Sequence, residues 1–271
     1  MCTRFLLPAA RISFLVLLLI DGFASAATAQ QRIAIVNVGA LPESVDINPV
    51  TDRVYVANAG SNTITVISAT SHAVIDTIAV WRAGQVAVNP VTNRIYSAGL
   101  GSGVLSVIDG ISHAVTSVPA PISECPCGVA VNSVTDRVYV TRPRTGDLLV
   151  YDGATNGLVA TVNIGLDPHH LIVNEAANKI YVLQNSGFTG AGIVVVDGAT
   201  NTKLRTMVVM AEDLALDRQT GFVYAVMEYP RFLHVIDGSV DSLVQSIPLT
   251  DFFGNVFQID PRSVLALNLP A

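Results

Sequence analysis

Hydrophobic and polar residues alternate in short runs along most of this chain. Residues 53–57 (RVYVA) and 63–67 (TITVI) are typical, since both are short, rich in β-branched residues and bounded by turn-forming residues. Residues 45–47 and 72–80 complete one unit, with an NPVTD turn after the first run. The pattern predicts four short strands, which we name A to D in chain order.

The four-strand unit recurs along the chain. The Asn or Asp that ends strand A, called the anchor below, returns at intervals of 41 to 43 residues, at Asn48, Asn89, Asn132, Asn174, Asp217 and Asp260. A period in the low forties with several strands per unit is typical of a propeller blade, and the apolar runs are too short for a helical repeat. A tyrosine lies seven positions after five of the anchors, at Tyr55, Tyr96, Tyr139, Tyr181 and Tyr224. We expect these tyrosines to pack each blade on its neighbour.

The two ends of the repeat predict how the ring closes. Residues 35–44 (IVNVGALPES) match residues 161–170 (TVNIGLDPHH), where a D strand leads into the next A strand. Residues 257–271 supply an A strand and a B strand. Pairing the first strand with the last blade would close the ring and cover both sheet edges. We therefore predict an all-β propeller of four-stranded blades, with six blades, the last incomplete and closed by the N-terminal strand.

Basic residues also recur in phase with the blades. They begin the B strands at Arg53, Arg94, Arg137 and Lys179, on the face that carries the Asp-Gly turns between strands C and D. Because this arrangement repeats from blade to blade, we interpret it as structural. Exposed ion pairs of this kind contribute about 0–1 kcal/mol each.

Three phrases carry a resemblance to a known family. NPVTDRVYVAN (48–58), NSVTDRVYVT (132–141) and ECPCGVAVN (124–132) resemble the YVTN-type β-propeller repeat family, which is related to NHL and quinoprotein-like propellers. The resemblance covers about residues 31–269. It implies an exported or surface-layer protein, and it implies no particular ligand because the shared residues are the structural ones.

The first 29 residues have the pattern of a secretory signal peptide. Arg4 and Arg11 form a basic start, residues 12–20 are apolar, and small-x-small cleavage sites lie at 24–26 and 27–29. A bilayer span needs about 20 apolar residues, so this run is too short to be a membrane anchor. We expect residues 1–29 to be a signal peptide and residues 30–271 a single propeller domain. The protein would then be exported to the periplasm, the cell surface or the extracellular space.

Composition narrows the possible partners. The formal net charge of −6 does not favour nucleic acid or anionic lipid through bulk charge. Only Cys125 and Cys127 follow the leader, too few for a disulfide framework. No catalytic signature such as G-x-S-x-G, a P-loop or H-E-x-x-H occurs. We expect a monomer that has no cofactor and no membrane span in the mature chain.

Function is expected where the repeats differ. The fifth position before each anchor begins strand A, which lines the central channel, at the face of the D–A and B–C loops. This position and the next hold the candidate ligand-binding residues, namely Glu43, Cys127, His169, His170, Glu212, Asp213 and Asn255. Further along strand A the residues become apolar, as at Val45 and Leu171. Polar groups converging above an apolar wall predict a site for a small polar ligand, a peptide or a glycan.

Two classes of function remain open at this stage. The first is a non-enzymatic binding or scaffold protein using the D–A/B–C loop face, where the loops carry Trp81-Arg82 and Arg142 beside the channel. The second is a metal-assisted enzyme, a lyase or lactone hydrolase, in which His169 binds zinc or a similar ion with Glu43, Glu212 or Cys127. A third interpretation is purely structural, because D–A junctions also tolerate polar residues that face solvent.

Overall fold

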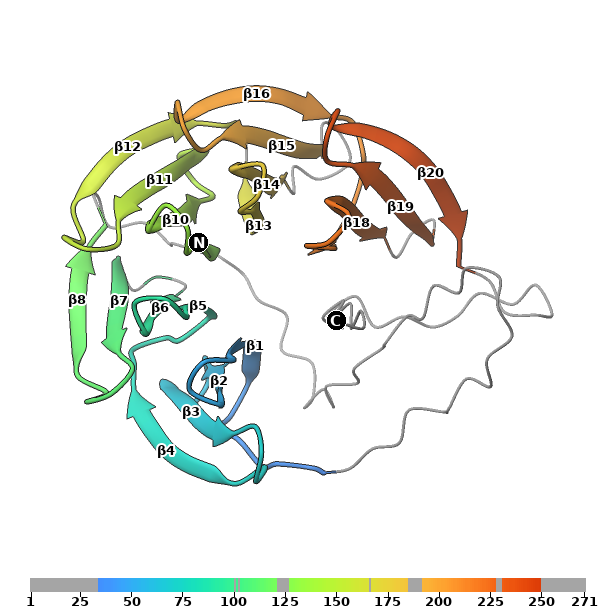
Figure 1. Cartoon of the computed structure of the whole chain (residues 1–271). Helices are drawn as coiled ribbons and strands as arrows, with labels where there is room; N and C mark the ends of the chain where they lie inside the picture. Colours follow the sequence, from blue (N-terminus) through green and yellow to red (C-terminus); the bar gives the residue numbers. More distant parts are fainter. Residues whose placement is uncertain are drawn as a thin grey trace.

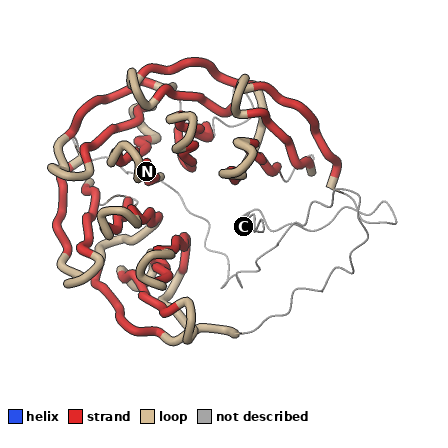
Figure 2. The backbone as a smooth tube through the Cα atoms, in the orientation of Figure 1, coloured by secondary structure: helices blue, strands red, loops and turns tan. Residues whose placement is uncertain are grey.

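The computed structural model describes residues 34–99, 101, 103–120, 127–165, 167–184, 192–227 and 231–249. These residues form five antiparallel sheets of four strands each, and no helix occurs among them (Figure 2). In every sheet the strands pair in chain order, so each sheet is a meander. Within this part of the chain, no helix has the length and apolar character needed to cross a membrane.

The sheets, numbered 1 to 5 below, follow one another along the chain. Sheet 1 contains β1 (Pro42–Asn48), β2 (Arg53–Asn58), β3 (Thr63–Ser68) and β4 (Val74–Ala79). Sheet 2 contains β5 (Gln85–Asn89), β6 (Arg94–Ala98), β7 (Val104–Asp109) and β8 (Val115–Pro119). Sheet 3 contains β9 (Val129–Asn132), β10 (Arg137–Arg142), β11 (Asp147–Asp152) and β12 (Leu158–Asn163). Sheet 4 contains β13 (Pro168–Asn174), β14 (Lys179–Gln184), β15 (Gly192–Asp197) and β16 (Thr202–Met207). Sheet 5 contains β17 (Asp213–Leu216), β18 (Phe222–Met227), β19 (Phe232–Asp237) and β20 (Ser242–Pro248).

The five sheets are arranged around a central axis. Figure 1 shows β4, β8, β12, β16 and β20 along the outer rim. The first strands of the sheets are neighbours near the centre, in the order β1, β5, β9, β13 and β17. This arrangement is a β-propeller built from four-stranded blades, and it confirms the fold class predicted from the period of the repeat.

Strand boundaries follow the sequence pattern with two shifts in sheet 1, where β1 begins at Pro42, three residues before the expected strand A, and strand D begins later than expected. The expected strand D began at residue 72, whereas β4 begins at Val74. His72 has a φ of +57° and its N–H bonds the carbonyl oxygen of Ser68 at 2.9 Å. The residue therefore closes the turn between β3 and β4 and cannot continue an extended strand.

The predicted sixth blade lies largely outside the described residues. Residues 34–39 are described without strand structure, and residues 257–271, their expected partner, are not described. Residues 42–44, the end of the matched stretch 35–44, belong to β1. Any D strand at the start of the domain therefore lies before Pro42. Six blades and closure by the N-terminal strand therefore stay predictions.

The structure explains why an asparagine anchors the repeat. Oδ1 of Asn48 accepts hydrogen bonds from the N–H groups of Val50 and Thr51, at 3.0 and 3.3 Å, and so closes the turn after β1. Its Nδ2 donates to Oδ1 of Asn93 in the next sheet, at 2.9 Å. Two further sheet pairs repeat the second bond, from Asn89 to Asp136 and from Asn132 to Asn178. One amide side chain therefore shapes its own blade and fastens the next one.

The apolar core lies between the sheets rather than within any one of them. Each of four buried clusters combines side chains from two successive sheets. One repeat tyrosine lies in each cluster, and all four are fully buried: Tyr55, Tyr96, Tyr139 and Tyr181. The tyrosines therefore pack blade against blade, as the repeat predicted.

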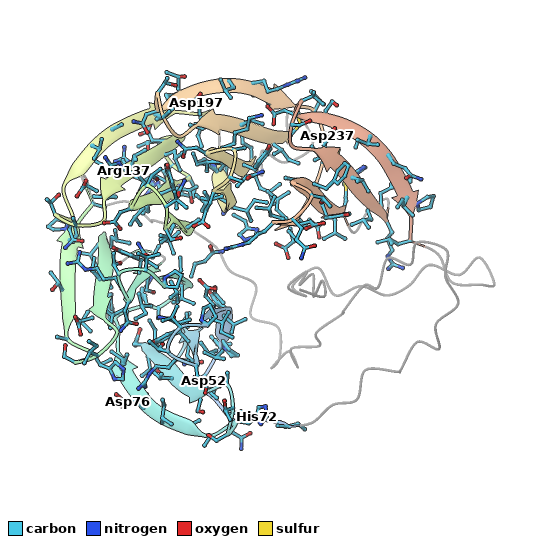
Figure 3. All side chains as sticks on the ribbon, viewed as in Figure 1. Asp52, His72, Asp76, Arg137, Asp197 and Asp237 are labelled. Atoms are coloured by element: carbon cyan, nitrogen blue, oxygen red, sulfur yellow. The ribbon has the colours of Figure 1, made fainter. Side chains whose placement is uncertain are left out.

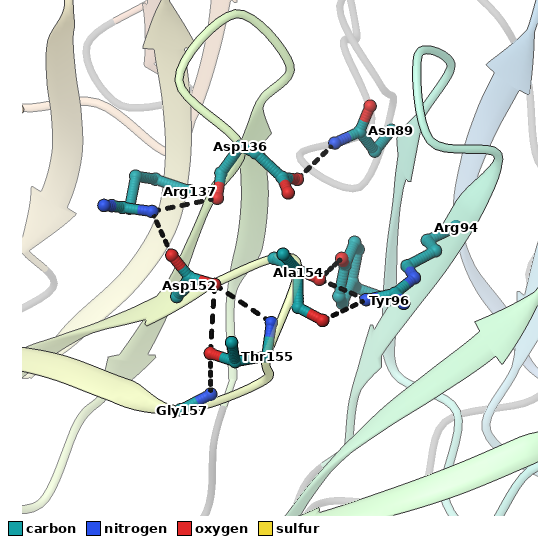
Figure 4. Close-up of polar contacts among 10 residues, drawn as sticks. Asn89, Arg94, Tyr96, Asp136, Arg137, Asp152, Ala154, Thr155 and Gly157 are labelled. Atoms are coloured by element: carbon teal, nitrogen blue, oxygen red, sulfur yellow. Dashed lines mark hydrogen bonds and ion pairs between the residues drawn. The ribbon is translucent and has the colours of Figure 1, made fainter.

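Two of the recurring bases contact the Asp-Gly turn of the following sheet. Nη1 of Arg94 donates to the carbonyl oxygens of Gly153 and Ala154, and the Tyr96 hydroxyl lies 3.4 Å from the same Gly153 oxygen (Figure 4). Lys179 reaches the Gly238 carbonyl oxygen in the same way, at 3.0 Å. These bases have a structural role, as the repeat predicted.

The aspartates of these turns bond their own backbone. Oδ1 of Asp197 accepts from the N–H groups of Ala199 and Thr200, at 2.7 and 2.9 Å. Oδ1 of Asp237 accepts from Ser239 N–H at 2.8 Å. Both aspartates, labelled in Figure 3, end a C strand and begin the turn to strand D. Hydrogen bonds to the ionised carboxylates lower the pKa of both groups.

Candidate functional site

The predicted ring residues lie at the start of the inner strands or directly before them. Glu43 is on β1, Cys127 precedes β9 by two residues, His169 and His170 are on β13, and Glu212 and Asp213 stand at the start of β17. Because these strands are neighbours around the central axis, their first residues lie at the same end of that axis. We call this end the channel mouth. Asn255 lies outside the described residues.

His170 and Asp213 connect sheets 4 and 5 at the channel mouth. Nδ1 of His170 lies 2.8 Å from Oδ1 of Asp213, a close polar contact without the geometry of a hydrogen bond, and the side chains are 30% and 15% exposed. The same carboxylate oxygen accepts the N–H of Leu214 at 2.8 Å, which fixes its orientation. An imidazole held against an oriented carboxylate can present its other nitrogen as a donor or an acceptor. The equivalent residues of sheets 1 to 3 are Ser44, Gln85 and Gly128, so blade packing does not require this pair.

His169 contacts a different carboxylate. Its Nε2 lies 3.1 Å from Oδ1 of Asp167 in the preceding loop, and both side chains are about 40% exposed or more. The backbone of His169 is fixed from sheet 3, because its carbonyl oxygen accepts the Thr141 hydroxyl at 2.8 Å. The imidazole is therefore exposed on an anchored backbone and available to a ligand.

Cys127 is positioned by the same contact between sheets 3 and 4. Its N–H donates to the Thr141 carbonyl oxygen at 3.2 Å, and the Gly128 N–H donates to the Thr141 hydroxyl at 2.8 Å. A Cβ on Gly128 would overlap the carbonyl oxygen of His169. Glycine at this position therefore allows the backbone beside Cys127 to lie directly against that of His169.

Glu43 and Ser44 face sheet 2. Oε2 of Glu43 lies 3.5 Å from the point where a Cβ on Gly84 would stand. The Ser44 hydroxyl accepts the N–H of Val86 on β5 at 3.3 Å. Together with the histidine contacts, these bonds place polar side chains at the junctions between successive inner strands.

The predicted metal set is not assembled as one centre in the described part of the chain. No group of three or more His, Cys, Asp and Glu side chains suited to a metal ion occurs there. His169 and His170 contact two separate carboxylates, Asp167 and Asp213.

Arg142, which was expected in a loop at the site, ends β10 and forms an ion pair within the β10–β11 hairpin. Its Nη2 lies 2.5 Å from Oδ2 of Asp147, and the side chains are only 6% and 13% exposed. A buried ion pair of this kind braces the turn between β10 and β11. We therefore assign Arg142 to the fold rather than to ligand contact.

Sequence reasoning missed a carboxylate further along the inner strand β1. Oδ2 of Asp46 on β1 accepts the N–H of Val88 on β5 at 2.7 Å. Burial raises the pKa of Asp46, against the lowering effect of its backbone hydrogen bonds. The signal was present in the repeat, since the equivalent residues, two before each anchor, are Ala87, Ala130, Ile172 and Ala215.

The opposite end of the channel carries a second chain of contacts between sheets. Oε1 of Glu175 accepts the N–H of Ser133 at 2.6 Å, and its Oε2 lies 3.5 Å from Nη1 of Arg218. Arg218 also lowers the pKa of Asp46 slightly, as the smallest of the effects on that carboxyl. These residues link sheets 3, 4 and 5 near the turns that follow strand A.

Comparisons with known proteins bear on the fold alone. No family model matches the sequence, and no curated protein matches it. Among solved structures, the chain is similar to hydrazine synthase from Kuenenia stuttgartiensis, with a TM-score of 0.70 and 13% sequence identity. The likeness covers 86% of this chain and 72% of that chain. Since the identity is so low, it supports the propeller fold and carries nothing about activity.

Proposed function

We propose that this protein is an exported, non-enzymatic member of the YVTN-type propellers that binds its ligand through the D–A/B–C loop face. The contact between His170 and Asp213, at 2.8 Å across two sheets, is the observation that carries the proposal. Blade packing does not require it, because Ser44, Gln85 and Gly128 occupy the equivalent positions. A partly exposed imidazole beside a fixed carboxylate supplies both a donor and an acceptor for a small polar ligand, a peptide or a glycan.

The pattern of variation around the ring supports the same role. Side chains that serve only the fold are alike from blade to blade, as Tyr55, Tyr96 and Tyr139 are. At the mouth the residues differ, and the backbone of His169 is fixed by a contact with the neighbouring sheet. Rigid backbone with variable polar side chains reduces the ordering that binding requires.

Ligand binding is tested by thermal shift with a library of small polar compounds. A ligand present at about 100 times its Kd stabilises the folded state by about 2.7 kcal/mol. We expect at least one compound to raise the Tm of the wild-type chain and of Val134→Ala, a control in the turn after β9, where the side chain is 76% exposed. The same compound should fail to shift His170→Ala and Asp213→Asn. Equal shifts in all four proteins would overturn the assignment of the site.

The non-enzymatic part of the proposal has its own test. The alternative, a metal-assisted lyase or lactone hydrolase built on His169, Glu43 and Glu212, requires bound metal. Elemental analysis of purified protein should show no stoichiometric metal that depends on His169. Stoichiometric metal that disappears in His169→Ala would replace the binding role with the enzymatic one.

Export is tested by fractionation of a bacterial host that expresses the whole sequence. We expect the exported protein to begin at Gln30, and intact-mass analysis measures this start. Leu17→Asp, which interrupts the apolar run at residues 12–20, should retain the full-length protein in the cytoplasm. A wild-type chain found unprocessed in the cytoplasm would contradict export and leave the binding site untouched.

A further inference from the structure

We propose that Trp81 and Arg82 form a platform for a saccharide ring on the D–A/B–C loop face. The inference rests on the proposed function and names the ligand class. Trp81 is the only tryptophan of the chain, lies in the loop between β4 and β5, and is 61% exposed. This large aromatic side chain has no counterpart in the other repeats, and its exposed ring is suited to stacking on a ligand.

The loop that carries Trp81 is anchored on both sides. The N–H groups of Val80 and Arg82 donate to the carbonyl oxygen and to Oδ1 of Asn62, both at 2.9 Å. The flanking residues Val80 and Ala83 are buried. Only the indole and its neighbour Arg82 are exposed between them, so little backbone ordering remains to be done when a ligand binds.

Sheet 2 fixes the same loop from its other side. The Gly84 N–H donates to the carbonyl oxygen of Ala98 at 3.2 Å. A Cβ on Gly99 would overlap the carbonyl oxygen of Arg82, so the end of β6 lies directly against the loop. The backbone that carries the indole is therefore held by two sheets.

The residues next to the indole decide which ligand chemistry it suits. The flat face of an indole binds apolar C–H faces, other rings or cations. The guanidinium carbon of Arg82 lies 5.9 Å from the centroid of the Trp81 ring, so a second cation would be repelled there. A neutral ligand with an apolar face remains, and the guanidinium offers several N–H donors to hydroxyl groups at the edge of that ligand.

A pyranose ring combines these two features. Its C–H face can stack on the indole, and the hydroxyls around its edge can accept from Arg82. The carboxylate of Glu43 lies beside Gly84 of the same loop and supplies acceptors for sugar hydroxyls. A nucleic-acid strand fits less well, because its phosphates would meet this carboxylate and a net charge of −6.

The single tryptophan makes the site directly observable, because all indole fluorescence comes from Trp81. The probes are cellotetraose, maltotetraose, chitotetraose and mannotetraose, with tetralysine as the cationic comparison. We expect at least one sugar to shift the emission saturably to shorter wavelength, and tetralysine to leave it unchanged. A saturable shift with tetralysine and with no sugar would overturn the inference.

Calorimetry on variants separates stacking from other contacts. Trp81→Ala should weaken binding of that sugar at least about tenfold, a difference of about 1.4 kcal/mol, and Trp81→Phe should retain part of the affinity. Val134→Ala, in the turn after β9 at the opposite end of the inner strands, should bind like the wild type because its side chain is 76% exposed and lies away from the D–A/B–C loop face. Binding that survives Trp81→Ala but is lost in His170→Ala would overturn the platform and leave the proposed function standing. Absence of binding for all four sugars would also overturn the platform, whereas the proposed function stands as long as another compound binds at the mouth.

Discussion

The Tyr181 hydroxyl on β14 donates a hydrogen bond of 2.7 Å to Oδ1 of Asp241, in the turn of the next sheet. The hydroxyl oxygen of Tyr181 also lies 3.2 Å from the carbonyl oxygen of Gly238. Tyr55 occupies the equivalent position in sheet 1, where its hydroxyl is buried with no hydrogen-bond partner among the described residues. Both rings are fully buried, so the two positions are alike in packing and differ in hydrogen bonding.

This difference makes the two tyrosines a matched pair for mutation. Tyr181→Phe should lower the free energy of unfolding by about 1.5–3 kcal/mol, because it removes a buried bond to a carboxylate. Tyr55→Phe should change it by less than about 0.5 kcal/mol, since no bond is lost. Urea unfolding measures both values. Equal losses in the two variants would show that the hydroxyl of Tyr181 contributes nothing beyond packing.

Because the pKa of Asp46 is raised in the folded protein, we predict that the protein loses stability as the pH rises. Burial raises the pKa of Asp46 above the ordinary value near 3.8. A carboxyl whose pKa is raised on folding favours the folded state while protonated, so its contribution is full below the ordinary pKa and is lost as the pH rises through the folded-state value. Asp46→Asn keeps an oxygen for Val88 N–H and removes this charge. Its unfolding free energy relative to the wild type should increase from about pH 4 to pH 7. A difference that stays constant over this range would contradict the raised pKa.

The turn aspartates predict the opposite sign. Hydrogen bonds from the N–H of Thr200 and other groups in its own turn lower the pKa of Asp197. A lowered pKa gives stability that is present above the ordinary value and is lost as the pH falls through the folded-state value. Asp197→Asn should therefore be less stable than the wild type at pH 7, and the difference should shrink toward pH 3. Unfolding curves recorded from pH 3 to pH 7 measure this difference in unfolding free energy. A difference that grows as the pH falls would contradict the lowered pKa of Asp197.

The fold could be read from the sequence because each blade contacts only its neighbours. Asn48 recurs as an anchor since its side chain closes one turn and reaches Asn93 of the next sheet, and both partners recur in phase. Such local rules leave a period in the sequence. The repeat tyrosines were predictable for the same reason.

The site could be read only in part, because it depends on which side chains meet across sheets. The repeat placed His170 and Asp213 at one height, yet their contact follows from side-chain orientation, which no period encodes. Asp46 was missed although Ala87 and Ala130 stand at its equivalent positions. A single departure from an apolar position is a weak signal until the structure shows the backbone N–H it binds.

The ring residues and the packing tyrosines should respond differently to truncation. Tyr139 is fully buried between sheets 3 and 4, so Tyr139→Ala should lower the free energy of unfolding by about 3–5 kcal/mol. The His169 side chain is 40% exposed, and His169→Ala should change the free energy of unfolding by less than about 0.5 kcal/mol. Glu212→Ala should behave like His169→Ala, since Glu212 is exposed. Ring variants that melt as early as Tyr139→Ala would make the ring a structural element and remove the basis of the proposed site.

We predict that the close packing of sheets 3 and 4 at Gly128 holds His169 in place at the channel mouth. A Cβ there would overlap the His169 carbonyl oxygen and lie 2.6 Å from Cδ2 of Leu171, so β13 approaches sheet 3 closely only because the residue is glycine. Gly128→Ala should lower the free energy of unfolding by about 1–3 kcal/mol, because the backbone of His169 cannot move without breaking its bond to Thr141. It should also weaken ligand binding by displacing His169.

Gly157→Ala is the matched control for this effect. Gly157 lies in the turn between β11 and β12 of the same sheet, where the nearest atom to a new Cβ is the Thr155 hydroxyl oxygen at 3.2 Å. The contact is with an exposed hydroxyl of the same turn and not with the backbone of another sheet, so the free energy of unfolding should change by less than about 0.5 kcal/mol. Amide chemical shifts around His169 should move in Gly128→Ala and stay in place in Gly157→Ala. If Gly128→Ala unfolds like the wild type, sheets 3 and 4 have room to separate, and the backbone that holds His169 at the mouth is not fixed by this contact.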